Sequence, residues 1–294
     1  MESFAAALAD RVVLLDGGLA TRLEARGHDL SDTLWSARLL LEDPDEIRAT
    51  HEDFFAAGAE VATTASYQVS ESGFEAAGHT AAEAREALRR SVRLAREASE
   101  AFGAPRWVAA SVGPYGATLA DGSEYRGDYG LSVAQLRAWH RPRLEILAEA
   151  GADLLACETI PSLAETEALA AELDSLGIPA WIALTTVGDR TRRGEPASEA
   201  YAIAAEVPNV VALGANCCDP DDAAAVLAAV GGRRPVVFYP NSGEQWDSAG
   251  RVWTGEPAAA GSARAWSRAG VRGLGGCCRV TPEQIGGMRA ELDR

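Results

Sequence analysis

The chain has 294 residues, 47% of them hydrophobic and 24% charged, a composition typical of folded globular proteins. Its 27 basic and 43 acidic residues give a formal net charge of −16. This charge argues against nucleic acid or an anionic membrane as a partner, because both require a basic face. Every basic residue is an arginine, so chemistry that depends on a Schiff-base, pyridoxal or P-loop lysine is excluded.

The first ten residues predict a short amphipathic helix rather than a signal peptide, because they lack a basic segment followed by a long apolar run. No stretch of about 18 uninterrupted apolar residues occurs, which predicts no transmembrane helix. Five cysteines are too few for the disulfide scaffold of a secreted protein of this length. We therefore expect a cytoplasmic protein with reduced thiols. The sequence leaves its oligomeric state open.

Short apolar runs with the character of buried strands recur along the whole chain. In chain order they are Val12–Asp16, Val61–Ala65, Trp107–Val112, Asp153–Glu158, Ala180–Thr185, Val210–Gly214, Pro235–Tyr239 and Val271–Gly275. Each run is followed by a segment with helical periodicity. The clearest of these segments are Pro44–Ala57, Ala81–Phe102, Ser132–Ala150, Ser162–Leu176, Pro220–Val230 and Pro257–Ala269.

The helical segments carry signals at both ends. Ser132 and Asp219-Pro220 suit helix starts, and Gly151 and Gly177 fall just past helix ends, where a left-handed residue is common. Eight strands alternating with helices predict an α/β fold with a parallel sheet. The count and the length favour a closed (β/α)8 TIM barrel, one domain over residues 1–294, with its active site at the carboxyl ends of the strands.

Cysteines fall at or just past three of the predicted strand ends. Cys157 lies late in the fourth strand, Cys217 and Cys218 follow the sixth, and Cys277 and Cys278 follow the eighth. The sixth and eighth strands of a barrel are separated only by the seventh, so these thiols can meet at one mouth. Three thiolates with an open fourth position would form a catalytic zinc site. The alternative is that the cysteines are small buried hydrophobic residues.

The orientation of the paired cysteines decides which of them can share a metal. Neighbouring residues on a strand point to opposite faces, so Cys277 and Cys278 can bind one ion only if the strand breaks. Gly275–Gly276 provides the conformational freedom for such a break. For the Cys217–Cys218 pair, we expect one thiol to point into the mouth and the other away, and the residues alone do not choose between them.

Other polar residues stand at the same strand ends. Asp16, which ends the first strand, can bind an ammonium group, and Gly17 and Gly18 can let a substrate approach backbone N–H groups. A turn with a helix cap is the alternative. Glu158 ends the fourth strand among apolar residues, which favours a functional carboxylate. Asn216 precedes the first cysteine pair, and we expect it to contact the substrate.

The seventh strand and the histidines are less informative. The segment Tyr239–Gly243, which includes Asn241, can line a pocket or form a simple turn. The four histidines lie in predicted loops or helices, where we expect them to be solvated or to cap helices. They are His28, His51, His79 and His140.

Seven motifs together resemble the homocysteine S-methyltransferase family. They are LLDGGLAT at 14–21, TTASYQ at 63–68, SVGPYGATLADGSEYRGDYG at 111–130, ETIPS at 158–162, GANCC at 214–218, YPNSGEQWD at 239–247 and GGCCR at 275–279. The resemblance covers essentially the whole chain. The two longest motifs are similar to the branch that uses S-methylmethionine or S-adenosylmethionine.

The resemblance implies a (β/α)8 barrel with a zinc ion bound by three cysteines. In the family the first ligand follows the asparagine of a GxNC motif, which implies Cys217 rather than its neighbour. The other two implied ligands are Cys277 and Cys278. The resemblance further assigns Asp16 and Glu158 to the ammonium group of homocysteine. It also implies that two aromatic residues lie near the methyl donor, namely Tyr67 and Trp35.

The implied reaction is zinc-dependent transfer of a methyl group from a sulfonium donor to the thiol of homocysteine, which forms methionine. The sequence does not choose between S-methylmethionine and S-adenosylmethionine. One alternative is methyl transfer to selenocysteine or another small thiol or selenol. Two others lie outside this chemistry: a non-catalytic zinc-binding barrel, and a redox sensor that forms a disulfide between Cys277 and Cys278.

Overall fold

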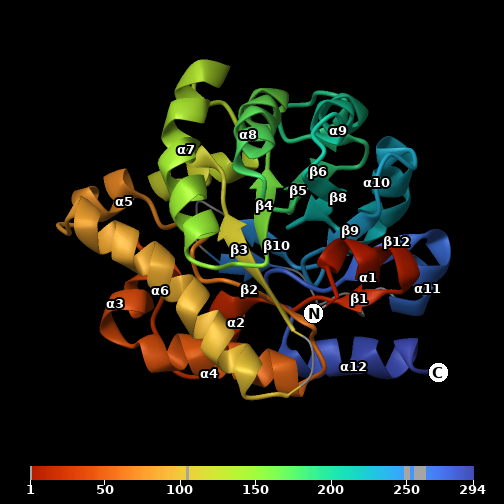
Figure 1. The fold of residues 1–294 in the computed structure, drawn as a ribbon, viewed down its shortest axis with the longest axis horizontal. Coiled ribbons are helices and arrows are strands. Elements are labelled where there is room, and N and C mark those ends of the chain that lie inside the picture. The colour runs from red at the N-terminus through yellow and green to blue at the C-terminus, as the bar shows by residue number, and fades with distance from the viewer. Residues whose placement is uncertain (1, 104–105, 248–251, 255–262) are drawn as a thin grey trace.

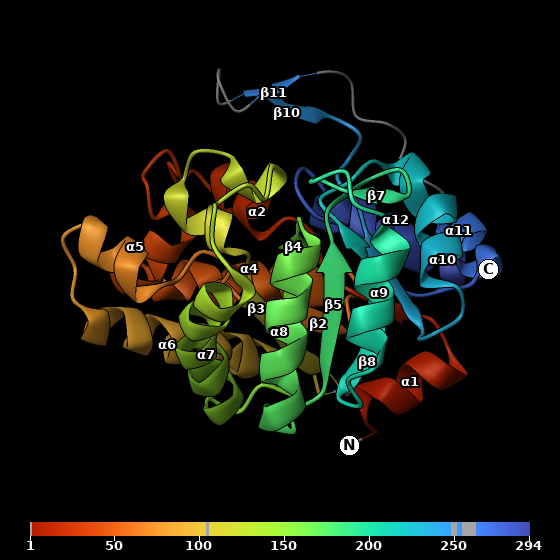
Figure 2. The same ribbon diagram turned by 90° about the horizontal axis from the view of Figure 1, so that it is seen from above.

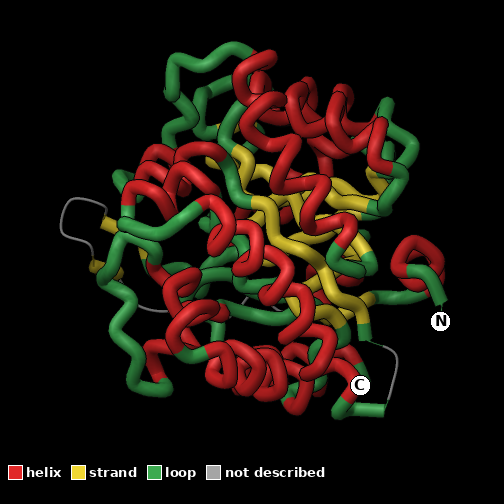
Figure 3. Tube along the Cα trace, turned by 60° about the vertical axis from the view of Figure 1, so that its left-hand side comes forward, coloured by secondary structure: helices red, strands yellow, loops and turns green. Residues whose placement is uncertain are grey.

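The computed structural model describes residues 2–103, 106–247, 252–254 and 263–294. Within these residues, eight parallel strands form one sheet, surrounded by helices (Figure 3). In sheet order the strands are β1 (Val13–Leu14), β12 (Val271–Leu274), β9 (Val236–Tyr239), β8 (Val210–Asn216), β5 (Ala180–Leu184), β4 (Leu154–Ile160), β3 (Trp107–Val112) and β2 (Val61–Thr63). All eight apolar runs are confirmed as strands.

The two ends of this sheet, β1 and β2, come together and nearly close the barrel. The Glu60 N–H donates to Leu14 O at 2.7 Å, and beyond it the Thr63 N–H donates to Asp16 Oδ2 at 2.6 Å. The side-chain carboxylate of Asp16 therefore takes the place of a backbone carbonyl as the acceptor from β2. Strand β1 is accordingly shorter than the predicted run Val12–Asp16. The prediction of a single-domain (β/α)8 barrel is confirmed.

Helices cover the outside of the barrel (Figure 1). They are α2 (Leu19–Ala25), α3 (Leu39–Glu42), α4 (Pro44–Ala56), α5 (Glu71–Ala76), α6 (Ala81–Glu100), α7 (Val133–Glu149), α8 (Leu163–Leu176), α9 (Ala197–Ala205), α10 (Ala223–Val230), α11 (Ala263–Ala269) and α12 (Pro282–Leu292). Short 3-10 helices lie in the loops: η1 (Trp35–Arg38), η2 (Tyr115–Leu119), η3 (Ser123–Tyr125) and η4 (Pro220–Asp222). The six predicted helices are found, although residues 257–262 of the last one lie outside the described residues.

Local signals explain where several helices begin and end. Thr80, Ser132 and Thr281 each form a capping box at a helix start, which satisfies backbone N–H groups that have no partner inside the helix. Gly151 and Gly177 have φ values of +88° and +70°, as predicted for residues that follow helix ends. No helix in the described part of the chain has the length and apolar character needed to cross a bilayer.

The N-terminal residues form α1 (Phe4–Asp10), as predicted. This helix covers the end of the barrel at which the parallel strands begin, here called the lower end. Its Phe4, Ala7 and Leu8 belong to the apolar cluster inside the barrel, together with Trp107 and Trp181. Two small hairpins were not predicted. They are β6–β7 (Thr186–Val187 and Arg190–Thr191) and β10–β11 (Gln245–Asp247 and Val252–Thr254). Figure 2 shows the second hairpin at the end of the molecule opposite α1.

Candidate active site

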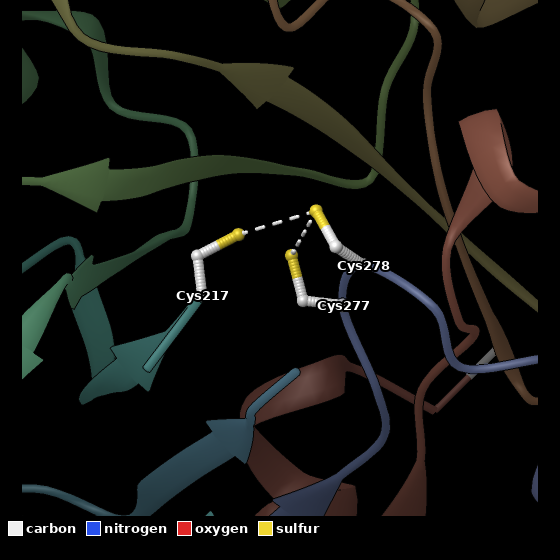
Figure 4. Close-up of side chains that lie close together, drawn as sticks. All are labelled: Cys217, Cys277 and Cys278. Carbon is white, nitrogen blue, oxygen red and sulfur yellow. Dashed lines mark hydrogen bonds between the residues drawn. The ribbon is translucent and has the colours of Figure 1, made fainter. Parts of the chain in front are cut away.

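Three thiols from the ends of β8 and β12 meet at the carboxyl end of the barrel. The distance from Cys217 Sγ to Cys278 Sγ is 3.9 Å, and the distance from Cys277 Sγ to Cys278 Sγ is 4.0 Å. The three sulfur atoms all lie within 4.8 Å of one another and point toward a common space (Figure 4). The adjacent Cys218 is instead buried in the outer apolar layer of the barrel. Of this pair, Cys217 faces the mouth.

A left-handed backbone turn aims Cys217 at the other two thiols. Its φ is +48°, a conformation that costs a non-glycine residue about 1–3 kcal/mol. Asn216 is the last residue of β8. If the backbone stayed extended beyond it, the side chain of Cys217 would point to the face opposite the side chain of Asn216. The carbonyl of Cys217 accepts hydrogen bonds from Thr185 Oγ1 at 3.1 Å and Arg192 Nη2 at 3.3 Å. These two donors help to hold the strained residue in place.

The strand breaks before the second cysteine pair, as predicted. A Cβ atom on Gly275 would lie 2.7 Å from Asp16 O, and one on Gly276 would lie 2.2 Å from Val280 Cγ1. Neither glycine has a positive φ. The reason for glycine is therefore close packing, rather than the conformational freedom that the sequence suggested. The Cys277 N–H donates to Pro240 O at 2.8 Å, and Cys278 O accepts from the Ser242 N–H at 3.2 Å.

Hydrogen bonds among the three thiols shift the pKa of Cys217 in one direction and those of Cys277 and Cys278 in the other. The pKa of the Cys217 thiol lies well below its usual range, because Cys277 and Cys278 donate to it and polar contacts with Tyr125 and Thr159 add to the effect. The same bonds raise the pKa of Cys277 and Cys278. Three thiols that interact so closely form one coupled group, suited to share a cation.

Asn216 links the thiol cluster to the end of β4. Its Oδ1 accepts from the Thr159 N–H at 2.6 Å, its Nδ2 donates to Thr159 Oγ1 at 2.9 Å, and Nδ2 also lies 3.8 Å from Cys277 Sγ. Thr159 has a left-handed φ of +60°. The sequence predicts a substrate contact for Asn216. In the structure both polar atoms of its amide bond to protein groups, and this arrangement orients Cys277.

The carboxylates Asp16 and Glu158 are buried near the thiols. Asp16 Oδ1 accepts from Thr63 Oγ1 at 2.9 Å, in addition to the backbone bond that closes the barrel, and Glu158 Oε1 accepts from the Ser111 hydroxyl. Burial raises the pKa of Asp16 to about 7 and that of Glu158 to about 8. Among the described residues, no basic side chain lies within 4 Å of either carboxyl. Both therefore suit a cationic group of a ligand.

The predicted loop glycines have a role in packing. A Cβ on Gly17 would lie 2.6 Å from Val280 O, and one on Gly18 would lie 2.7 Å from Cys277 O. The Gly18 N–H already donates to Val280 O at 2.9 Å. This loop therefore packs against the backbone of the second cysteine pair, and the Gly18 N–H is occupied by the protein rather than held open for a substrate.

Aromatic residues line the same end of the barrel. Tyr67 packs onto Gly113, whose Cβ would lie 2.8 Å from its ring. The pKa values of Tyr67 and Tyr125 are raised, first by burial and then by negative charge that includes Cys217. Tyr125 lies within the motif at residues 111–130, but nothing in the spacing of that motif indicates that Tyr125 belongs to the site. Trp35 is the first residue of η1 and has a φ of +51°. Its contact with the methyl donor stays a prediction.

Asn241 remains a candidate for ligand binding. Its N–H donates to Cys218 O at 3.1 Å, while its side-chain Oδ1 is buried and has no hydrogen-bond partner among the described residues. A buried acceptor without a donor is unfavourable, so this atom suits a polar group of a ligand.

Two of the histidine predictions are wrong. His51 in α4 and His140 in α7 are 1% and 0% exposed, instead of solvated or at helix caps. Burial lowers the pKa of His51 to about 4 and also lowers that of His140, whose Nε2 lies 2.9 Å from Glu165 Oε1. Both lie on the helices that cover the barrel, so the prediction that no histidine stands at a strand end holds for them.

Comparisons with known proteins agree with this geometry. The family model for homocysteine S-methyltransferase matches residues 13–292. The chain is 47% identical to a homocysteine S-methyltransferase of Escherichia coli (95% of this chain, 94% of that protein). It is 40% identical to a selenocysteine Se-methyltransferase of Brassica oleracea (95% and 88%).

A solved structure gives the same result. The homocysteine methyltransferase MmuM from E. coli, in its metallated form, matches with a TM-score of 0.84 and 45% identity, over 96% of each chain. The match to the family model covers far more than half of the chain, and the sequence and structural relatives agree with it. The chain therefore belongs to the homocysteine S-methyltransferase family.

Proposed function

We propose that this methyltransferase uses zinc to transfer a methyl group from a sulfonium donor, S-methylmethionine or S-adenosylmethionine, to the thiol of homocysteine, which forms methionine. The observation that carries this proposal is the convergence of three thiols beside two buried carboxyls that have no basic partner in the part of the chain that the structure describes. A thiol-bearing amino acid is complementary to such a site, because its sulfur suits a metal and its ammonium suits the carboxylates.

The thiol geometry fits zinc. Tetrahedral zinc with zinc–sulfur bonds of about 2.3 Å places its sulfur ligands about 3.8 Å apart, close to the 3.9 Å and 4.0 Å distances at Cys278. Three protein ligands leave one position open, as in catalytic zinc sites. A structural or storage site has four protein ligands, and the cluster in the described residues contains three. This count favours the catalytic reading over a non-catalytic zinc-binding barrel.

When bound, zinc would supply an open position for the sulfur of homocysteine and favour the thiolate form of that sulfur. The residues Asp16 and Glu158 would hold the ammonium group. Near neutral pH burial keeps both carboxyls partly protonated in the empty site, because their pKa values are about 7 and about 8. A bound ammonium would lower both pKa values and favour the carboxylate forms. The Ser111 hydroxyl fixes one oxygen of Glu158.

The donor needs little assistance from acids or bases, because a sulfonium is already an activated leaving group. The rings of Tyr67 and Trp35 would contact the cationic donor through their faces. The excess negative charge of three thiolates would attract it. Holding both substrates in line for methyl transfer supplies much of the remaining acceleration. The observation that His51 and His140 lie on the outer helices agrees with this mechanism.

The test is methionine formation by zinc-loaded protein, with kcat/KM measured for homocysteine and each of the two sulfonium donors. We expect turnover with at least one donor and loss of turnover when a chelator removes the metal. No methionine from either donor, with one zinc bound per chain, would contradict the proposal. The ratio of the two kcat/KM values would identify the preferred donor.

Selenocysteine is a second candidate acceptor, because a selenocysteine Se-methyltransferase is 40% identical to this chain. A selenol is more acidic than a thiol and would occupy the same open position. A competition assay with equal concentrations of homocysteine and selenocysteine separates the two. We expect methionine to be the main product, and a predominance of methylated selenocysteine would reverse the assignment.

We also propose a cytoplasmic location. Thiolate ligands must stay reduced, and the cytosol maintains that state. Secretion of the native protein with its zinc site oxidised would contradict this proposal, and fractionation of the source cells with a thiol assay would test it.

A further inference from the structure

One arginine reaches the thiol cluster from outside the strands. Arg192 directly follows β7 of the β6–β7 hairpin. Its Nε donates to Thr185 Oγ1 at 3.1 Å and its Nη2 to Cys217 O at 3.3 Å. Its guanidinium carbon lies 5.5 Å from the centre of the Tyr125 ring. The guanidinium is thus fixed beside the backbone of a thiol-bearing residue in the mouth of the barrel.

Among the described residues Arg192 has no direct ion pair, although the more distant carboxylate of Asp222 interacts with its charge. Within the described residues, no carboxylate oxygen lies within 4 Å of its guanidinium nitrogens, and Nη1 has no hydrogen-bond acceptor. The contrast with α7 is clear, where Arg137 and Arg141 both bind Glu172 at 2.6 Å and 2.7 Å. The nearby Asp222 bonds instead to the Gly188 N–H at 3.1 Å. A half-buried guanidinium with donors to spare is suited to a carboxylate.

A half-buried acidic residue lies next to Tyr125 in the chain. Glu124 is the preceding residue, and its Oε2 is buried with no hydrogen-bond partner among the described residues. Its interaction with Cys217 places it near the same thiol. Glu124 and Arg192 do not form an ion pair with each other within 4 Å. Burial raises the pKa of Glu124 to about 7, and a bound ammonium would favour its carboxylate form. A guanidinium and a carboxyl that do not pair with each other match the carboxylate and the ammonium of an amino acid.

We propose that Arg192 binds the α-carboxylate of the amino-acid methyl donor, an inference that rests on the proposed function. Both candidate donors are amino acids and carry this group. Homocysteine also has a carboxylate, but its ammonium is assigned to Asp16 and Glu158, which lie at the ends of β1 and β4. Arg192 approaches by way of Cys217 and Tyr125 instead. The donor is therefore the substrate whose carboxylate it meets.

The test combines a variant with a truncated donor. Arg192→Met and Arg192→Lys are compared with wild type on S-methylmethionine and on (3-aminopropyl)dimethylsulfonium, which lacks only the carboxylate. We expect Arg192→Met to lose on the order of 10–100-fold in kcat/KM on S-methylmethionine, and less than about twofold on the truncated donor. Arg192→Lys should retain part of the activity. Zinc content and the KM for homocysteine should stay within about twofold of wild type, because Thr185 Oγ1 still donates to the carbonyl of Cys217.

The matched control is Arg190→Met, on β7 of the same hairpin, where the side chain is exposed. It should behave as wild type on both donors. Equal losses of Arg192→Met on the two donors would overturn the proposal and reduce Arg192 to a support for the Cys217 backbone. A loss that depends instead on the carboxylate of homocysteine, measured against 3-aminopropanethiol, would overturn the assignment to the donor. A wild-type enzyme that forms no methionine from either S-methylmethionine or S-adenosylmethionine would contradict the proposed function itself.

Discussion

The two ends of the barrel interior are built from the same strands and have opposite character. Along β4, Leu154 and Ala156 are fully buried in the inner apolar cluster, and two residues further on stands Glu158. At the lower end, Phe4 of α1 packs against Trp107 and Trp181, with ring centroids 5.8 Å and 5.5 Å apart. At the upper end, thiols lie near two carboxyls that have no basic partner within 4 Å among the described residues.

This difference shows how one architecture divides stability from chemistry. The lower end is filled by aromatic and aliphatic side chains that gain stability from burial. The upper end holds buried polar groups at a cost, which hydrogen bonds from Thr63 and Ser111 offset in part and a bound ligand would offset further. The boundary lies at Tyr239, whose hydroxyl accepts from Trp181 Nε1 at 2.9 Å and also bonds to Glu158. Changes at the two ends should therefore affect different measurements.

The largest expected effect is at the upper end. Cys277→Ala should lower kcat by about 10³-fold or more, because a site that lacks one of three ligands binds zinc weakly. The free energy of unfolding of the zinc-free protein should change by less than about 1 kcal/mol. The control is Cys157→Ala, in the outer apolar layer, which should keep both zinc and activity. Full activity of Cys277→Ala would remove it from the site.

At the lower end the effect should fall on stability. Phe4→Ala should reduce the free energy of unfolding by about 3 kcal/mol, because it opens a cavity between α1 and the two tryptophans. Urea unfolding measures this loss, and Phe4→Leu should recover much of it. Below the unfolding transition, kcat and the KM for homocysteine should stay within about twofold of wild type. A large loss of activity in the folded variant would mean that the two ends are coupled.

The role of Glu158 can be isolated from zinc binding. Glu158→Gln should raise the KM for homocysteine on the order of 100-fold, because a buried ammonium loses its charged partner. Zinc content should be unchanged. Glu167→Gln, at an exposed position of α8, is the control. An unchanged KM for homocysteine would refute the assignment of Glu158 to the ammonium group.

The smallest expected effect is on the stability of the zinc-free protein. Above about pH 5, Glu158→Gln should have a higher free energy of unfolding than wild type. The pKa of Glu158 is raised from 4.5 to about 8 by burial, so its contribution to stability is complete below about pH 4.5 and is lost as the pH rises toward 8. Between pH 5 and pH 7, wild type should lose about 2 kcal/mol relative to Glu158→Gln. Urea unfolding at the two pH values measures the difference, and parallel pH profiles would contradict it.

The elements of the barrel could be predicted because apolar runs and capping signals are local. The eight strands, and the glycines that end helices, follow from such patterns. The site could be predicted only in part, since strand ends locate the cysteines but the residues alone do not orient the 217–218 pair. The family resemblance, rather than spacing, favoured Cys217. In the structure Cys217 is the residue of the pair that lies beside Cys277 and Cys278, in a left-handed turn whose carbonyl accepts hydrogen bonds from Thr185 and Arg192.

The remaining features depend on contacts between distant segments. The bond from Thr159 to Asn216 joins β4 to β8, and no periodicity indicates it. Arg192 lies in a hairpin that the sequence does not predict. We expect His51 and His140 to be solvated or to cap helices because they lie in predicted loops or helices, but both are buried. In each case tertiary packing, rather than local preference, decides the environment.

The central claim is that Cys217, and not Cys218, completes a three-thiolate metal site, and zinc content tests it most directly. Cys217→Ala and Cys218→Ala change neighbouring residues of the same type, one beside the other two thiols and one in the apolar layer. Each protein is loaded with zinc, dialysed, and measured for zinc per chain. The account predicts about one zinc for wild type and Cys218→Ala, and almost none for Cys217→Ala. Retention by Cys217→Ala with loss from Cys218→Ala would contradict it.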